Sequence, residues 1–119
     1  MQDITIWHNA KCSKSRNAIN LLEEKNINAD VVKYLESTPS SEEIKNVLAL
    51  LGMSAKELMR KGESIYKELK LDEVNDEAKL IETMAQNPIL IERPIIIRGN
   101  KAVIARPIEN MELLLKKYM

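Results

Sequence analysis

The sequence is poor in residues that cross-link or bind metals, and it is poor in aromatic side chains. Its 119 residues include one Cys, one His and no Phe, and aromatic residues make up only 3%. A single Cys cannot form an internal disulfide, so a disulfide framework is excluded and a reducing compartment is indicated. The core must therefore be built from Leu, Ile, Val, Met and Ala.

The sequence also lacks an excess of one charge and any long apolar run. Because 18 basic residues balance 18 acidic ones, we expect no non-specific binding to nucleic acid. No apolar run reaches the length that spans a bilayer, and the first residues resemble a strand rather than a targeting segment. We therefore expect a cytoplasmic protein with no membrane contact. The length fits one domain, residues 1–119, and the balanced surface predicts a monomer.

The two ends of the chain show strand and helix patterns in a regular order. Residues 3–7 and 29–35 are β-like, and residues 14–25 between them carry an apolar stripe with helical spacing. Residues 94–105 contain two apolar runs around an Arg-Gly-Asn-Lys turn, which predicts a hairpin. Pro107 then fits the first turn of a closing helix.

Helices are expected between these ends, over about residues 38–88. Two capping-box patterns, each a Ser followed three positions later by Glu, open helices here. They begin at Ser40 and Ser54, and the two helices are expected to end at Gly52 and Gly62. The order β-α-β, helices, β-β-α predicts an α/β thioredoxin-like sandwich with a helical insertion.

Cys12 lies in the predicted turn between the first strand and the first helix. Free N–H groups at a helix start favour negative charge, so they stabilise a thiolate and can also hold an oxyanion beside it. Positive charge or hydrogen-bond donors come from His8, Lys11, Lys14 and Arg16. The segment offers Cys12 no apolar face, which favours a reactive thiol over a small buried side chain.

Other chemistries do not fit the spacing. A phosphatase-type anion loop needs Arg six positions after the Cys, where Ala18 stands. A two-cysteine redox pair needs a second Cys at the position of Asn9 or Ser15. No metal site is expected, because no further His or Cys exists to complete one with His8 and Cys12. No Gly-rich loop indicates a bound nucleotide or flavin.

Residues 8–16, HNAKCSKSR, resemble the His-Asn-x-x-Cys-x-x-Ser-Arg signature of the glutaredoxin-coupled arsenate reductases. Further segments similar to that family follow in the same order along nearly the whole chain. They are YLESTPS (34–40), LMRKGE (58–63), NPILIERPIII (87–97) and IARP (104–107). The resemblance is to the shorter members of the family.

The resemblance implies that Cys12 is the nucleophile and that three arginines bind the oxyanion. These arginines are Arg60, Arg93 and Arg106. A guanidinium suits this task because its planar fork forms bidentate, charge-assisted hydrogen bonds and does not lose its proton. The resemblance also implies a cis peptide bond before Pro94, opposite Cys12, which would bring Arg93 to the site.

Supporting roles are implied for other residues of the first motif, namely His8, Asn9, Ser15 and Arg16. Two neighbours depart from the family pattern. Trp7 stands where Tyr is common, and Ala10 stands where Pro is common. We expect both changes to alter the rate of the reaction rather than its type.

The implied function is reduction of arsenate to arsenite with glutathione as co-substrate and glutaredoxin as protein partner. No bound cofactor or metal is implied. Two alternatives share the fold: a glutathione-dependent thiol transferase acting on another substrate, and a thiol-sensing regulator that binds RNA polymerase. The regulator typically carries Cys-x-x-Cys, whereas Ser15 stands at the second position here. A domain with an inert Cys is a further alternative.

Overall fold

The computed structural model describes residues 4–105 and 108–115. The chain divides into two compact units, one formed by residues 1–37 together with 93–119, the other by residues 38–92. The second unit covers nearly the same residues as the predicted insertion. That the whole chain acts as a single domain stays a prediction.

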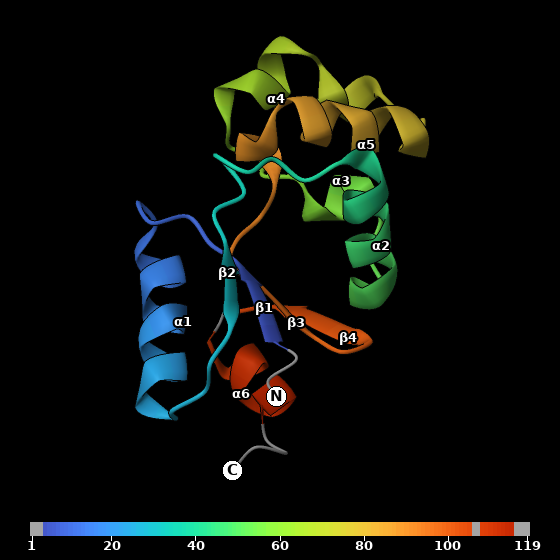
Figure 1. Ribbon diagram of the computed structural model, residues 1–119. Coiled ribbons are helices and arrows are strands. Elements are labelled where there is room, and N and C mark those ends of the chain that lie inside the picture. The colour runs from blue at the N-terminus through green and yellow to red at the C-terminus, as the bar shows by residue number, and fades with distance from the viewer. Residues whose placement is uncertain (1–3, 106–107, 116–119) are drawn as a thin grey trace. The chain divides into compact units, whose positions relative to one another are not determined.

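The first unit contains a four-stranded sheet in the order β2-β1-β3-β4 (Figure 1). The strands are β1 (Ile4–Trp7), β2 (Asp30–Val32), β3 (Ile95–Arg98) and β4 (Lys101–Ile104). β1 runs parallel to β2 and antiparallel to β3, and β3 forms the predicted hairpin with β4. A parallel β-α-β unit joined to an antiparallel hairpin and a closing helix confirms the thioredoxin-like fold.

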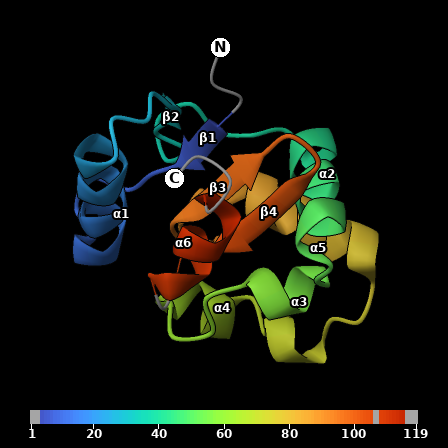
Figure 2. The ribbon, with the colours of Figure 1, turned by 90° about the horizontal axis from the view of Figure 1, so that it is seen from below.

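The core of this unit is aliphatic, as the shortage of aromatic residues predicts. Ile6 of β1 lies opposite Ile96 of β3, and both side chains are fully buried. Helices α1 (Ser13–Glu24) and α6 (Glu109–Leu115) supply the other side of this core. Their buried members are Ala18, Leu22, Met111, Leu114 and Leu115. Figure 2 shows α6 beside β4, which it contacts.

Strand β2 is shorter than the sequence predicts. It ends at Val32 rather than at residue 35. The reason is a turn in which the carbonyl of Lys33 accepts hydrogen bonds from the N–H groups of Glu36 and Ser37, at 2.9 and 2.8 Å. Tyr34, within this turn, is buried and stacks on Trp7 with ring centroids 6.5 Å apart.

The second unit is helical. Its elements are α2 (Ser41–Leu51), α3 (Ala55–Leu58), α4 (Ser64–Glu68) and α5 (Glu77–Gln86), with 3-10 turns at Leu71–Glu73 and Pro88–Leu90. Both predicted capping boxes are present, with Ser40 and Ser54 as the N-caps. Gly52 ends α2 in the left-handed conformation, with φ of 69°. Such a φ favours Gly because a Cβ would be strained there.

The predicted extent of the helix after Ser54 is wrong. Helix α3 ends at Leu58, not at Gly62, because Met59 turns extended and forms an antiparallel bridge with Ile91. The backbone N–H of Arg60 donates to the carbonyl of Leu90 at 2.7 Å, which continues this pairing. A contact with a segment thirty positions away thus overrides the local helical pattern.

Pro107 lies outside the described residues, while the closing helix α6 is present and buries Met111, Leu114 and Leu115. None of the helices that the structure describes combines the length and the apolar character needed to cross a membrane.

Candidate functional site

Cys12 is the N-cap residue of α1, in extended conformation with φ −96° and ψ 123°. Its carbonyl accepts the first intrahelical hydrogen bond, from the N–H of Arg16 at 3.0 Å, and the residue is partly exposed. No side chain caps this end of α1. The first amide N–H groups of the helix therefore point toward the region of the sulfur without a capping oxygen, which is the arrangement that binds an anion.

The loop that carries Cys12 is held by residues of the first motif. The backbone N–H of Asn9 donates to Oγ of Ser15 at 3.3 Å. The N–H of Lys11 donates to Oδ1 of Asn9, and the N–H of Cys12 donates to the Asn9 carbonyl, both at 3.0 Å. Because Asn9 and Ser15 are buried, these bonds are shielded from competing water.

Arg16 adds a further link to this loop. Its Nη1 donates to the carbonyl of Ala10 at 2.9 Å, so the side chain folds back from α1 toward the segment before Cys12. The guanidinium thereby brings positive charge close to the start of the helix.

His8 follows β1 directly and is 8% exposed. Its pKa is lowered from the usual 6.5, first by burial and then by the positive charges of Lys33 and Arg16, while a hydrogen bond with the backbone of Ser15 opposes this shift. The imidazole is therefore neutral at pH 7. Its Nδ1 atom is buried and has no hydrogen-bond partner among the described residues.

The sheet brings two further segments to the carboxyl end of β1, where the Cys12 loop begins. The last residue of β1, Trp7, pairs with Val32 of β2 and with Ile95, the first residue of β3. Because β3 runs antiparallel to β1, Arg93 and Pro94 precede β3 at the edge where the Cys12 loop leaves β1. The Arg93–Pro94 bond is cis, as the resemblance implies. The Nε and Nη1 atoms of Arg93 are buried.

Neither of the other two predicted arginines is a described residue of the first unit. Arg60 belongs to the second unit, where its Nη1 lies 3.3 Å from Glu63 and its Nε lies 3.6 Å from Glu92. The Nη1 atom is buried, and its contact with Glu63 is an ion pair without hydrogen-bond geometry. Arg106 lies outside the described residues.

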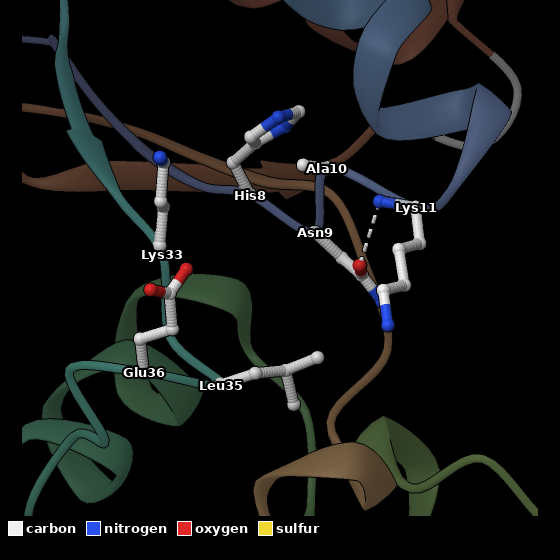
Figure 3. Close-up of a pocket in the computed structure, with 7 residues that line it drawn as sticks. All are labelled: His8, Asn9, Ala10, Lys11, Lys33, Leu35 and Glu36. Carbon is white, nitrogen blue, oxygen red and sulfur yellow. Dashed lines mark hydrogen bonds between the residues drawn. The ribbon is translucent and has the colours of Figure 1, made fainter.

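A pocket of about 270 Å³ adjoins the Cys12 loop (Figure 3). One wall is residues 8–11, and the other is formed by Lys33, Leu35 and Glu36 from the turn after β2. None of these three residues is among the predicted site residues. The signal that could have found them is topological, since the carboxyl ends of parallel strands meet at one edge of a sheet.

The arrangement suits thiol chemistry on an oxyanion. In the described ranges, no group of three or more His, Cys, Asp or Glu side chains is placed to hold a metal ion. What the edge does contain is a thiol at a helix start, amide donors beside it and an arginine before β3. These groups can bind an anion and attack its central atom.

Similarity to known proteins agrees with the motifs. The model of the ArsC family matches residues 7–114. An arsenate reductase from Neisseria meningitidis serogroup A is 47% identical over 117 residues, covering 97% of this chain and 100% of that protein. One from Escherichia coli is 40% identical, covering 92% of this chain and 78% of that protein. A solved structure of an arsenate reductase from Vibrio cholerae superimposes with a TM-score of 0.88 at 42% identity, covering 92% of this chain and 94% of that one. The chain belongs to the ArsC family.

Proposed function

We propose that the protein is an arsenate reductase that acts as a monomer in the cytoplasm, with Cys12 as its nucleophile. The observation that carries the proposal is the position of Cys12 at the uncapped start of α1. Relatives named arsenate reductases, at 40–47% identity over nearly the whole chain, support the choice of substrate.

In the first step, arsenate binds as an oxyanion at the amide N–H groups of α1, with Arg93 as a further donor. The Cys12 thiolate attacks arsenic, a sulfur–arsenic bond forms, and one oxygen leaves as water after protonation. Donors aimed at the oxygens stabilise the charge that develops during the attack. Asn9 and Ser15 act indirectly, by holding the loop that positions the sulfur.

In the second step, As(V) gains two electrons and becomes As(III). The single Cys of the chain cannot supply them as a disulfide, so external thiols must. Overall, arsenate and two thiols give arsenite, one disulfide and water, and the two thiol protons leave in the water with one arsenate oxygen. In this proposal glutathione is the attacking thiol and glutaredoxin completes the exchange through a mixed disulfide. Such an exchange needs a reducing compartment.

The roles that the resemblance implies for Arg60 and Arg106 stay predictions. Replacement of each by Lys tests them, because Lys keeps the charge but loses the planar fork. A loss of arsenate affinity with an unchanged unfolding temperature would assign either residue to the oxyanion.

The test of the proposal is arsenate-dependent NADPH oxidation coupled to glutathione, glutaredoxin and glutathione reductase. The wild type is compared with Cys12→Ser and with Ser13→Ala, a neighbouring control that keeps the thiol. We expect activity in the wild type and the control and none in Cys12→Ser. A wild type that transfers glutathione to and from protein disulfides but leaves arsenate unreduced would instead favour the thiol transferase.

A further inference from the structure

The pocket beside the Cys12 loop has a definite pattern of charge. Lys11 projects from one wall, and Lys33 and Glu36 project from the other (Figure 3). Within the described part of the chain, none of these three side chains takes part in an ion pair. The pocket therefore offers two ammonium groups and one carboxylate to a ligand, with the exposed apolar side chain of Leu35 among them.

The walls of this pocket are ordered before a ligand arrives. Tyr34, between Lys33 and Leu35 in the chain, is buried against Trp7 and fixes the turn after β2. The opposite wall is fixed by the bond from the Lys11 N–H to Oδ1 of Asn9. Preformed walls lower the entropy cost of binding.

The oxyanion substrate is a poor match for this pocket. A tetrahedral ion is small relative to about 270 Å³, and the carboxylate of Glu36 would repel it. Two ammonium groups and one carboxylate instead complement a molecule with two carboxylates and one ammonium group, joined by a flexible, partly apolar chain.

We propose that the pocket binds the reducing thiol as a small peptide with two carboxylates and one amine, the pattern of glutathione. Lys11 and Lys33 bind its carboxylates, and Glu36 binds its amine. This inference rests on the proposed function, which needs an external thiol next to Cys12. Lys11 immediately precedes Cys12, so a peptide held there has its thiol near the adduct on the Cys12 sulfur.

The test measures binding without chemistry. S-methylglutathione, which has no free thiol, is titrated into Cys12→Ser protein and followed by calorimetry and by the fluorescence of Trp7. Trp7 is the only Trp of the chain, and its stacking on Tyr34 ties it to the pocket wall. We expect saturable binding, weakened about two- to fivefold by Lys11→Gln and by Lys33→Gln.

Two controls separate the pocket from general electrostatics. Lys101→Gln removes an exposed lysine at the start of β4 and should leave the affinity unchanged. Lys101 pairs with Arg98, the last residue of β3, whereas the pocket lies at the other end of the strands. A dimethyl ester of S-methylglutathione, which lacks both carboxylates, should bind weakly to the protein with all lysines intact. Equal affinities for ester and acid, or an effect of Lys101→Gln as large as that of Lys33→Gln, would overturn the proposal.

The coupled arsenate assay distinguishes this failure from a failure of the proposed function. If arsenate is reduced and the KM for glutathione is the same in Lys33→Gln and wild type, the pocket assignment is wrong and the activity stands. If S-methylglutathione binds in a lysine-dependent way but arsenate is not reduced, the pocket stands and the substrate assignment is wrong.

Discussion

The backbone N–H of Asn9 and the hydroxyl of Ser15 join the two ends of the loop that carries Cys12. The bond spans the turn from the end of β1 to the first turn of α1, and Ser15 is fully buried. The Ser15 side chain therefore holds the loop that positions Cys12.

Ser15→Ala should lower both stability and activity. It leaves the buried N–H of Asn9 without an acceptor, which costs about 1–3 kcal/mol of unfolding free energy. Chemical denaturation and the arsenate assay measure the two effects. Ser13→Ala, at the exposed first position of the same helix, is the matched control and should change neither. Equal effects of the two substitutions would contradict the role of the Asn9–Ser15 bond.

Arg93→Lys should lower kcat/KM for arsenate about 100-fold, because one ammonium cannot reproduce the paired donors of a guanidinium at a developing oxyanion. Steady-state kinetics with saturating glutathione measure this. Arg98→Lys changes the same residue type at the far end of β3, where Nη1 donates to the carbonyl of Leu114. That control should affect stability alone, and a comparable kinetic loss in it would argue against a substrate contact for Arg93.

The stability of the protein should decrease as the pH falls through 6.5. His8 has a lowered pKa in the folded state, so the unfolded state takes up its proton first. The contribution of the neutral imidazole is complete above pH 6.5 and is lost as the pH falls toward the folded pKa. Because the chain has one His, NMR titration of its imidazole signals reads this pKa directly. Lys33→Gln should raise the pKa of His8, and an unchanged pKa would show that the charge of Lys33 does not affect the imidazole.

Tyr66 should ionise well above the usual tyrosine pKa of 10. Its hydroxyl donates to Oδ1 of Asp72 at 2.7 Å, and this bond, with burial and the negative charge of Asp72, raises the pKa of Tyr66 to about 12. The stabilisation is complete below the usual pKa of 10 and is lost as the pH rises through 12. The pKa of Tyr66 is measured from the ultraviolet absorbance of tyrosinate as the pH is raised. Asp72→Asn should move the ionisation back toward 10, and an unchanged titration would exclude Asp72 as the cause.

Ser40→Ala should cost about 1 kcal/mol of unfolding free energy by removing the N-cap of α2. The Ser40 hydroxyl accepts from the N–H of Glu43 at 3.1 Å, while the Glu43 carboxylate accepts from the Ser40 N–H at 3.0 Å. Ser41→Ala is an adjacent control outside the box. A loss of the same size in Ser41→Ala would show that the cap contributes nothing specific.

The features that the sequence predicts correctly are those determined locally. The capping boxes at Ser40 and Ser54 and the left-handed Gly52 involve residues within one turn of one another. Their sequence patterns specify the hydrogen bonds directly. The aliphatic core and the β3–β4 hairpin follow from composition and periodicity in the same way.

The features that the sequence does not predict depend on distant segments. Helix α3 stops early because Met59 pairs with Ile91, and no local signal near Met59 marks this bridge. The turn that ends β2 and places Lys33 and Glu36 at the pocket interrupts an apolar pattern that continues to Leu35. Local periodicity carries no information about a partner elsewhere in the chain.

The sheet register has a consequence for the order of folding. The pairing of Ile6 with Ile96 closes a chain loop that contains the whole second unit, whereas the capping boxes and helices of residues 38–92 form between near neighbours. Closing a long loop is entropically unfavourable, and prior folding of the intervening segment shortens it. We therefore expect amide protection in α2 and α5 to appear before that in β3 during refolding, measured by pulsed hydrogen exchange. Simultaneous protection would contradict this order. During synthesis on the ribosome, the proposed active site around Cys12 would then be completed only after β3 and β4 have been made, because Arg93 and β3 come late in the chain.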